Sequence, residues 1–188
     1  MRSWSGCSAD SIGQANAACP ACVMEKESVI HPFAPVWDEN CRILVLGTFP
    51  SVKSRENAFY YGHPQNRFWR MLGMVYGAEP PNTIEEKRGF LLLRRIALWD
   101  VIRECDIAGS SDSSIRGAVP NDLPALLEKC PISRVLLNGK TAEKIYLKYW
   151  KELPITHIAL PSTSPANAAC SMEKLVREWG NALKGENV

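Results

Sequence analysis

Residues 59–69 gather side chains that could hold a nucleobase and a water molecule. The run Phe-Tyr-Tyr-Gly-His-Pro-Gln-Asn-Arg-Phe-Trp places aromatic rings, His63 and Asn66 around a glycine and a proline. An aromatic face can stack on an unpaired base. An Asn amide offers one acceptor and two donors, which suits holding a water or reading a base edge. Asn66 and Tyr61 are therefore candidate site residues, whereas His63 fits either such a site or an ordinary loop.

Asp100 is an acidic residue inside an apolar stretch, Leu-Trp-Asp-Val-Ile at 98–102. A carboxylate in such a place is costly to bury unless it has a partner. Two interpretations stay open. Asp100 caps a loop N–H or pairs with Arg103, or it accepts hydrogen bonds from a bound base.

Two more segments, 47–54 and 160–168, have the composition of phosphate-binding turns. They read Gly-Thr-Phe-Pro-Ser-Val-Lys-Ser and Leu-Pro-Ser-Thr-Ser-Pro-Ala-Asn-Ala. Glycine after a strand lets the backbone turn sharply and approach a ligand. Hydroxyls and backbone N–H groups that precede a helix can cradle a phosphate. Each segment taken alone also fits a capped turn with no ligand.

The elements that must position these segments alternate between strands and helices. Apolar runs predict strands at 43–46, 96–102, 135–137 and 157–160. Helical spacing and capping residues predict helices at 66–76, at 82–95 with Asn82 and Glu85 as a capping box, and at 141–150 and 171–183. A further short helix, capped by Asn121 or Asp122, is predicted to run through Lys129. Phe68 and Trp69 fall on the apolar face of the first helix and are expected in the core.

Alternating strands and helices imply crossovers and a mostly parallel sheet. We therefore expect an α/β protein with three layers, α/β/α, around a central four-stranded sheet. Ligands bind outside the carboxyl ends of the strands in such sheets. The polar segments follow those ends, so they should meet on one rim; they are 47–51, 100–114, 138–141 and 161–167.

The order of these segments resembles the uracil-DNA glycosylase superfamily. The motifs Gly-Thr-Phe-Pro-Ser at 47–51 and Ser-Thr-Ser-Pro-Ala-Asn at 162–167 match the first and last superfamily motifs in place and spacing. Together with Tyr-Tyr-Gly-His-Pro-Gln-Asn-Arg-Phe-Trp, Leu-Trp-Asp-Val, Gly-Ser-Ser-Asp-Ser and Asn-Gly, they are similar to the hypoxanthine-DNA glycosylase branch. The resemblance covers about residues 30–185. It implies a glycosylase that flips a deaminated base out of double-stranded DNA and hydrolyses its glycosidic bond.

The resemblance also implies roles for individual residues. Most superfamily members order the attacking water with Asp, Asn or Glu at the third position of the first motif, which is Phe49 here. In the hypoxanthine branch an Asn of the second segment is essential, and its match is Asn66, the implied catalytic residue. The implied base-binding residues are Phe49, Tyr61, His63, Asp100 and Asn138. The implied DNA-binding residues are Ser51, Lys53, Ser54, Arg67, Ser162, Thr163, Ser164, Ala166 and Asn167, the last two where relatives insert a wedge.

Competing interpretations concern the substrate and the chemistry. Uracil-specific relatives carry a His where this chain has Ser162, so a uracil or mismatch glycosylase is the second choice. A relative that binds nucleic acid without catalysis is a third, although binding alone would not require Asn66. A nucleotide-binding protein unrelated to repair is expected to have a phosphate-binding loop such as Gly-x-Gly-x-x-Gly. This chain has no such loop, which disfavours that interpretation. No Lys falls in the motifs as a Schiff-base nucleophile, so we expect a monofunctional enzyme.

Net charge and hydropathy limit the partners and the cellular location that we expect for this protein. The formal net charge is +2, which excludes a polycation but allows a local basic patch for phosphate. No apolar run approaches the roughly 20 residues that span a bilayer, and no secretory pattern opens the chain. A cytoplasmic monomer without membrane partners is expected.

Residues 1–28 differ from the single glycosylase domain expected at 29–188. They are rich in Ser, Ala, Gly and Cys and lack periodicity, as in a flexible or metal-binding extension. Cys19 and Cys22 have metal-ligand spacing. One superfamily branch holds a four-iron cluster through such a pair and two later cysteines, but beyond Cys105 no partner has the expected spacing. We expect no cofactor and no metal, with an iron-sulfur cluster or zinc at Cys19 and Cys22 as the alternative.

Overall fold

A four-stranded parallel sheet forms the centre of the protein in a computed structural model that describes residues 27–185. Its strands are β2 (Ile43–Gly47), β3 (Ile96–Asp100), β6 (Arg134–Asn138) and β7 (Thr156–Leu160), in the order β3-β2-β6-β7. All three neighbouring pairs are parallel. The four predicted strands and the parallel sheet are thus confirmed. Strands β2, β3 and β6 are short apolar runs because side chains on both of their faces are buried, whereas three of the five residues of the edge strand β7 are exposed.

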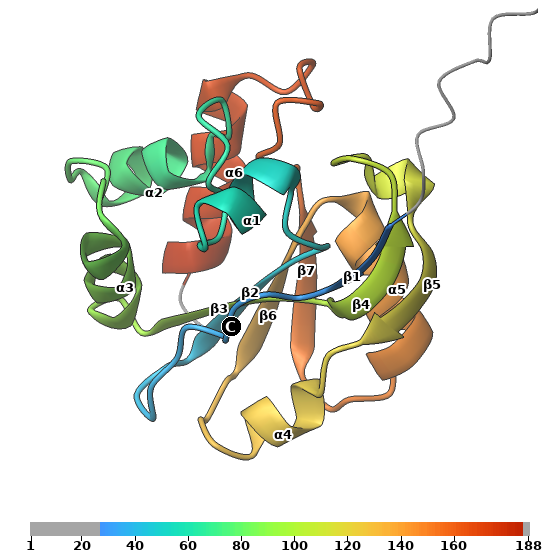
Figure 1. The fold of residues 1–188 in the computed structure, drawn as a ribbon. Helices are drawn as coiled ribbons and strands as arrows, with labels where there is room; N and C mark the ends of the chain where they lie inside the picture. Colours follow the sequence, from blue (N-terminus) through green and yellow to red (C-terminus); the bar gives the residue numbers. More distant parts are fainter. Residues whose placement is uncertain (1–26, 186–188) are drawn as a thin grey trace, which may run out of the picture.

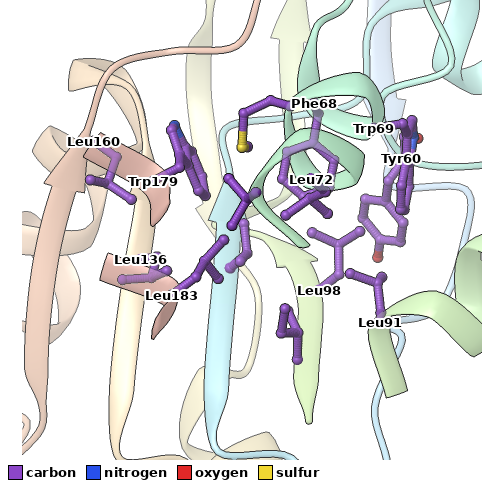
Figure 2. Packing of buried hydrophobic residues seen from close by; sticks show 14 of the residues in the cluster. Tyr60, Phe68, Trp69, Leu72, Leu91, Leu98, Leu136, Leu160, Trp179 and Leu183 are labelled. Carbon is purple, nitrogen blue, oxygen red and sulfur yellow. The ribbon is translucent and has the colours of Figure 1, made fainter. Parts of the chain in front are cut away.

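Helices cover both faces of this sheet, which confirms the three layers (Figure 1). On one face lie α2 (Phe68–Tyr76), α3 (Ile84–Leu92) and α6 (Met172–Lys184). Figure 2 shows how Leu98, Leu136 and Leu160 of the sheet lie with Leu72, Trp179 and other apolar side chains of these helices. On the other face lie α4 (Leu123–Leu127) and α5 (Lys140–Trp150). A short helix, α1 (Val52–Glu56), follows β2.

A second sheet, which the sequence analysis did not predict, packs beside α4 and α5. It is antiparallel, has the order β1-β4-β5, and consists of β1 (Glu27–Ile30), β4 (Ile102–Ile107) and β5 (Arg116–Pro120). The expectation of a polar loop over 100–114 was therefore wrong for its first half. The remainder holds a 3-10 turn, η1 (Asp112–Ser114). Residues 27 and 28 belong to β1, while residues 1–26 and the cysteines in them lie outside the described part.

Two helix starts differ from the expectation by one or two residues. The capping box is formed by Thr83 and Glu86 and not by Asn82 and Glu85. Thr83 Oγ1 accepts from the Glu86 backbone N–H at 3.1 Å, and the Glu86 carboxylate accepts from the N–H groups of Asn82 and Thr83. Those N–H groups lower the pKa of Glu86. Helix α2 begins at Phe68 rather than at Asn66, which leaves Asn66 outside the helix.

Four cysteines within residues 27–185 are free thiols, and all are buried; they are Cys41, Cys105, Cys130 and Cys170. Burial raises the pKa of Cys41 and of Cys105 to about 11. At pH 8 only about one molecule in a thousand then carries a thiolate at either position.

We expect Cys41 and Cys105 to resist iodoacetamide in the folded protein at pH 8 and to react fully in denaturant. Peptide mapping by mass spectrometry after a timed reaction measures this. Rapid alkylation of either residue without denaturant would show that the segment around it opens readily.

No helix within residues 27–185 is long and apolar enough to cross a membrane.

Candidate active site

The carboxyl ends of the four parallel strands form one edge of a cleft. Register pairs Gly47 with Asp100 and Asn138 with Leu160, so these strand ends lie in one row. The cleft beyond them has a volume of about 1030 Å³. All four loops that were expected to meet on this rim contribute to its lining. The predicted site residues that line it are Phe49, Ser51, Ser54, Tyr61, Asn66, Asp100, Asn138, Ser162, Thr163, Ser164, Ala166 and Asn167.

Asn66 lies in the cleft, half-buried, two residues before α2. Its Oδ1 accepts from the Phe68 backbone N–H at 3.0 Å. This bond fixes which end of the amide is the oxygen. A carbonyl oxygen has two lone pairs, so Oδ1 keeps one acceptor position. Nδ2 has no hydrogen-bond partner among residues 27–185. The amide is therefore held in place and still has both an acceptor and donors for a ligand.

Asp100 ends β3 at the inner wall of the cleft, where its residue is only 4% exposed. Its backbone carbonyl accepts from Asn121 Nδ2 at 2.8 Å, and Asn121 also binds the carbonyl of Ile102. Asn121 thus holds the backbone where the chain passes from β3 of the parallel sheet into β4. Asp122, the other proposed cap of the following helix, is the residue that caps α4.

His31 is the buried partner of the Asp100 carboxylate, and the sequence analysis missed it. Its Nε2 lies 2.9 Å from Asp100 Oδ2. Neither of the two earlier interpretations, a loop N–H or Arg103, provides the side-chain partner. The two residues are 69 positions apart, and no local pattern connects them. An isolated His before a run of polar and apolar residues carries no signal of its own.

Gly47 and Tyr61 fit closely around Asp100. A Cβ atom on Gly47 would overlap Asp100 Oδ1 and would lie 3.0 Å from the Tyr61 hydroxyl. Glycine is therefore required there by close approach. Tyr61 has a φ of +52°, an uncommon conformation for a residue with a side chain, and its ring lies 4.1 Å from that of Phe68. Burial, followed by the charge of Asp100, raises the pKa of Tyr61 well above its ordinary value. The phenol is neutral at physiological pH.

Asn138 and Thr163 join the ends of β6 and β7 to each other. Asn138 Nδ2 donates to Thr163 Oγ1, and the Thr163 backbone N–H donates to Asn138 Oδ1, each at 3.0 Å. Thr163 is fully buried. Its hydroxyl is thus committed to holding the loop, which differs from the phosphate contact expected of it. Asn138 lines the cleft but has part of its amide in this link.

Arg67 holds the loop that follows β7 and does not reach into the cleft. Its guanidinium donates to the backbone carbonyls of five loop residues, namely Ser162, Thr163, Ser164, Asn167 and Cys170. The sequence analysis expected a DNA contact from Arg67, as the family resemblance implied. All three guanidinium nitrogens instead donate hydrogen bonds to backbone carbonyls within the protein.

The serines divide into those that build the turns and those that remain accessible. Ser54 is buried, and its Oγ accepts from the Gly62 N–H at 3.0 Å, so it does not provide the expected phosphate contact. Ser51 caps α1 and is half-buried. In the loop after β7, Ser162 and Ser164 accept from the N–H groups two residues later. Ser51, Ser162 and Ser164 therefore remain the accessible hydroxyls.

Besides Arg67, two predicted residues lie outside the cleft. His63 Nδ1 accepts from the Gln65 N–H at 3.1 Å, which is the loop role left open for it. Lys53 pairs with Glu56 on exposed α1. Conversely, the cleft includes polar residues that were not predicted as site residues, among them Ser110, Asp112, Lys140 and Lys174. The two lysines are exposed and add positive charge to the rim. Ser110 and Asp112 stand in the motif Gly-Ser-Ser-Asp-Ser at 109–113, which was the available signal for them.

Comparison with known proteins agrees with this arrangement. The model of the family described as "Uracil DNA glycosylase superfamily" matches residues 34–184. The chain belongs to the uracil DNA glycosylase superfamily. The matched stretch begins after His31 and includes every residue that lines the cleft. Membership explains why the strand ends, and not the helix faces, carry the polar side chains.

Two similar curated relatives are both named hypoxanthine DNA glycosylase. The one from Methanosarcina acetivorans is 37% identical over 149 residues, covering 78% of this chain and 93% of that protein. The one from Methanosarcina barkeri is 34% identical over 154 residues, covering 81% and 96%. A solution NMR structure of a candidate uracil DNA glycosylase from M. acetivorans superposes with a TM-score of 0.73, at 34% identity, covering 83% of this chain and 98% of that one.

Metal ligands do not gather in the described part of the chain. Within residues 27–185, no group of three or more His, Cys, Asp or Glu side chains is placed to hold a metal ion. Cys19 and Cys22, the pair proposed for iron-sulfur or zinc, lie outside the described residues.

Proposed function

We propose that this protein is a monofunctional DNA glycosylase that excises hypoxanthine from double-stranded DNA in base excision repair. The observation that carries the proposal is the placement of the Asn66 amide and the Asp100 carboxylate in one cleft at the carboxyl edge of the sheet. Two relatives named hypoxanthine DNA glycosylase, similar over most of both chains, support it.

The enzyme has to extrude the damaged nucleotide, because the glycosidic bond is inaccessible inside a duplex. Extrusion costs a few kcal/mol and costs less at a mispair. The accessible hydroxyls of Ser51, Ser162 and Ser164 and the exposed Lys140 and Lys174 would hold the flanking phosphates. Ala166, exposed next to them, is too short to fill the gap that the base leaves.

Asn66 would position the attacking water. The Phe68 N–H occupies one lone pair of Oδ1, and a water proton would bind to the other. A water that donates its proton in this way keeps an oxygen lone pair for the anomeric carbon. The base departs with the electron pair of the glycosidic bond and takes up a proton from solvent. The water adds to the oxocarbenium-like sugar that remains, and its own proton leaves to solvent. Orientation and electrostatics supply the rate, without a covalent intermediate.

Asp100 would recognise the base. Hypoxanthine carries a proton on N1, and an ionised carboxylate accepts from it. Adenine, the parent base, has a bare nitrogen at the same position, which a carboxylate repels. Phe49 and Tyr61 line the cleft on the Gly47 side and would flank the purine ring. The same ring N–H occurs in uracil, so Asp100 alone does not separate the two deaminated bases.

Single-turnover release of bases tests the proposal. Duplexes that contain hypoxanthine, uracil, xanthine or a G/T mispair are incubated with excess enzyme, and abasic sites are cleaved with alkali before electrophoresis. We expect the fastest release from hypoxanthine and no strand cleavage before alkali. Faster release of uracil or of mispaired thymine would favour the second candidate, which Phe49 and Ser162 disfavour because they replace a water-ordering and a base-stabilising residue. No release from any duplex would point to a binding protein.

Asp100→Asn is expected to lower the rate on hypoxanthine by at least about tenfold. The Asn side chain turns a charged acceptor into a neutral amide, and a hydrogen bond to a charged group contributes roughly 1.5–3 kcal/mol. Asp112→Asn is the matched control, since Asp112 lines the same cleft and loses the same charge. Equal losses in the two variants would indicate a general charge effect, and an unchanged base preference in Asp100→Asn would remove Asp100 from recognition.

A further inference from the structure

His31 lies behind Asp100, outside the cleft and outside the part of the chain that the family model matches. It directly follows β1, and its backbone N–H donates to the Arg103 carbonyl of β4 at 2.7 Å. The pairing of β1 with β4 therefore fixes where the imidazole lies. The His31 and Asp100 side chains are 3% and 5% exposed, and 2.9 Å separates Nε2 from Oδ2.

The surroundings of the imidazole identify its protonation state. Nδ1 is buried and has no hydrogen-bond partner among residues 27–185. The ring is enclosed by aromatic side chains, with centroids 4.7 Å from Phe33, 5.8 Å from Tyr60 and 6.0 Å from Phe49. A proton on Nδ1 would be a buried donor with no acceptor, which costs about 1–3 kcal/mol. The geometry favours a neutral ring whose proton is on Nε2 and is donated to Asp100.

The two oxygens of Asp100 have different neighbours. Oδ2 accepts from His31, while Oδ1 lies against Gly47, at the place where any larger residue would overlap it. Both Gly47 and Asp100 line the cleft, and His31 does not. The imidazole therefore holds the carboxylate from the protein side by one oxygen and leaves the other next to the cleft.

We propose that His31 is a positioning residue that keeps Asp100 ionised and directs Oδ1 toward the ring N–H of a deaminated base. The proposal rests on the proposed function and extends it to discrimination between a deaminated base and its amino parent. Without the Nε2–H donor, Asp100 is a buried carboxylate with no side-chain partner, and such a group takes up a proton. A protonated Asp100 is a donor, and a donor binds the bare ring nitrogen of adenine that the carboxylate repels.

Two substitutions of His31 distinguish the loss of its hydrogen-bond donor from the loss of the volume of its ring. In His31→Gln the amide nitrogen reaches about the position of Nε2 and can donate to Oδ2. In His31→Phe a ring of similar size keeps the aromatic contacts and offers no donor. The probes are duplexes with 2′-fluoro-deoxyinosine or 2′-fluoro-deoxyadenosine, which resist hydrolysis, and a duplex with an abasic-site analogue that has no base to read. Fluorescence anisotropy gives the three dissociation constants.

We expect His31→Phe to lower the preference for inosine over adenosine by about tenfold or more, and His31→Gln to stay within about threefold of wild type. Affinity for the abasic duplex should be the same in all three proteins. An unchanged preference in His31→Phe, or an equal loss in both variants, would overturn the proposal. Because binding and not excision is measured, a wild type that binds selectively but releases no base would refute the proposed function and leave the role of His31 standing.

Nitrogen-15 NMR of the wild-type imidazole gives a second measurement that does not depend on how well a variant folds. We expect the His31 ring to carry its proton on Nε2 and to have a bare Nδ1. A ring protonated on Nδ1 alone would overturn the proposal, because Nε2 would then have no proton and would have to accept one from a neutral Asp100.

Discussion

Asn66→Ala is expected to lower the single-turnover rate of hypoxanthine release by about 10²- to 10³-fold, the loss typical when one preorganised polar contact to a reacting centre is removed. The amide oxygen is already fixed by the Phe68 N–H at 3.0 Å, so wild type needs no rearrangement to orient a water. Alanine leaves the water without its acceptor. Affinity for DNA should change by less than about threefold, since the duplex contacts come from other loops.

Gln65→Ala provides the control for that substitution. Gln65 is the exposed neighbour of Asn66 and does not line the cleft, so its removal should leave the rate unchanged. Asn66→Ala also takes away an acceptor near the start of α2, which costs about 1 kcal/mol of stability. Both variants are therefore assayed well below their melting temperatures. A rate in Asn66→Ala equal to that of wild type would remove Asn66 from the mechanism.

Arg67→Met is expected to lower the free energy of unfolding by about 3 kcal/mol, because it leaves a set of loop carbonyls without a charged donor. The guanidinium binds five carbonyls between Ser162 and Cys170, and methionine keeps only its apolar stem. Urea unfolding followed by tryptophan fluorescence measures the change.

The salt dependence of DNA binding distinguishes this role from a phosphate contact. Arg70→Met is the control, because Arg70 is exposed on the same helix and carries the same charge. We expect the plot of log affinity against log salt to keep a similar slope in both variants, with stability lost in Arg67→Met alone. If Arg67→Met instead kept wild-type stability and lowered the slope by about one, Arg67 would be a phosphate ligand.

Strands β2, β3 and β6 of the parallel sheet were predictable because they bury side chains on both faces and therefore appear as apolar runs, whereas β7 is mostly exposed and was predicted from the short run that ends before Pro161. Strand β4 reads Ile-Arg-Glu-Cys-Asp-Ile and mixes buried and exposed positions irregularly, so neither a strand nor a helix pattern stands out. Strand β1 has four residues and a single partner. Short edge strands gain their stability from pairing, which a local reading of the sequence does not contain.

The residues of the candidate site likewise divide into those that the local sequence identified and those that it did not. Asn66 and Asp100 were identified because they stand in motifs with a fixed order along the chain. His31 could not be identified, since its importance comes from a contact made 69 residues away. Arg67 and Thr163 were assigned to DNA because they stand in segments that the family resemblance implies to bind it. Their actual partners are backbone carbonyls and an amide in a distant loop, and only the folded chain brings these together.

The position of β1 has a consequence for how the protein folds. Its hydrogen-bonding partner β4 lies far along the chain, and four residues that pair on only one side offset little of the entropic cost of closing that loop. As an edge strand with an exposed Ile30, it is also an element that can detach while the rest stays folded. We expect amide hydrogens of β1 to exchange with solvent faster than those of β2 and β6. The wall of the cleft behind Asp100 would then be the last part of the molecule to assemble and the first to open.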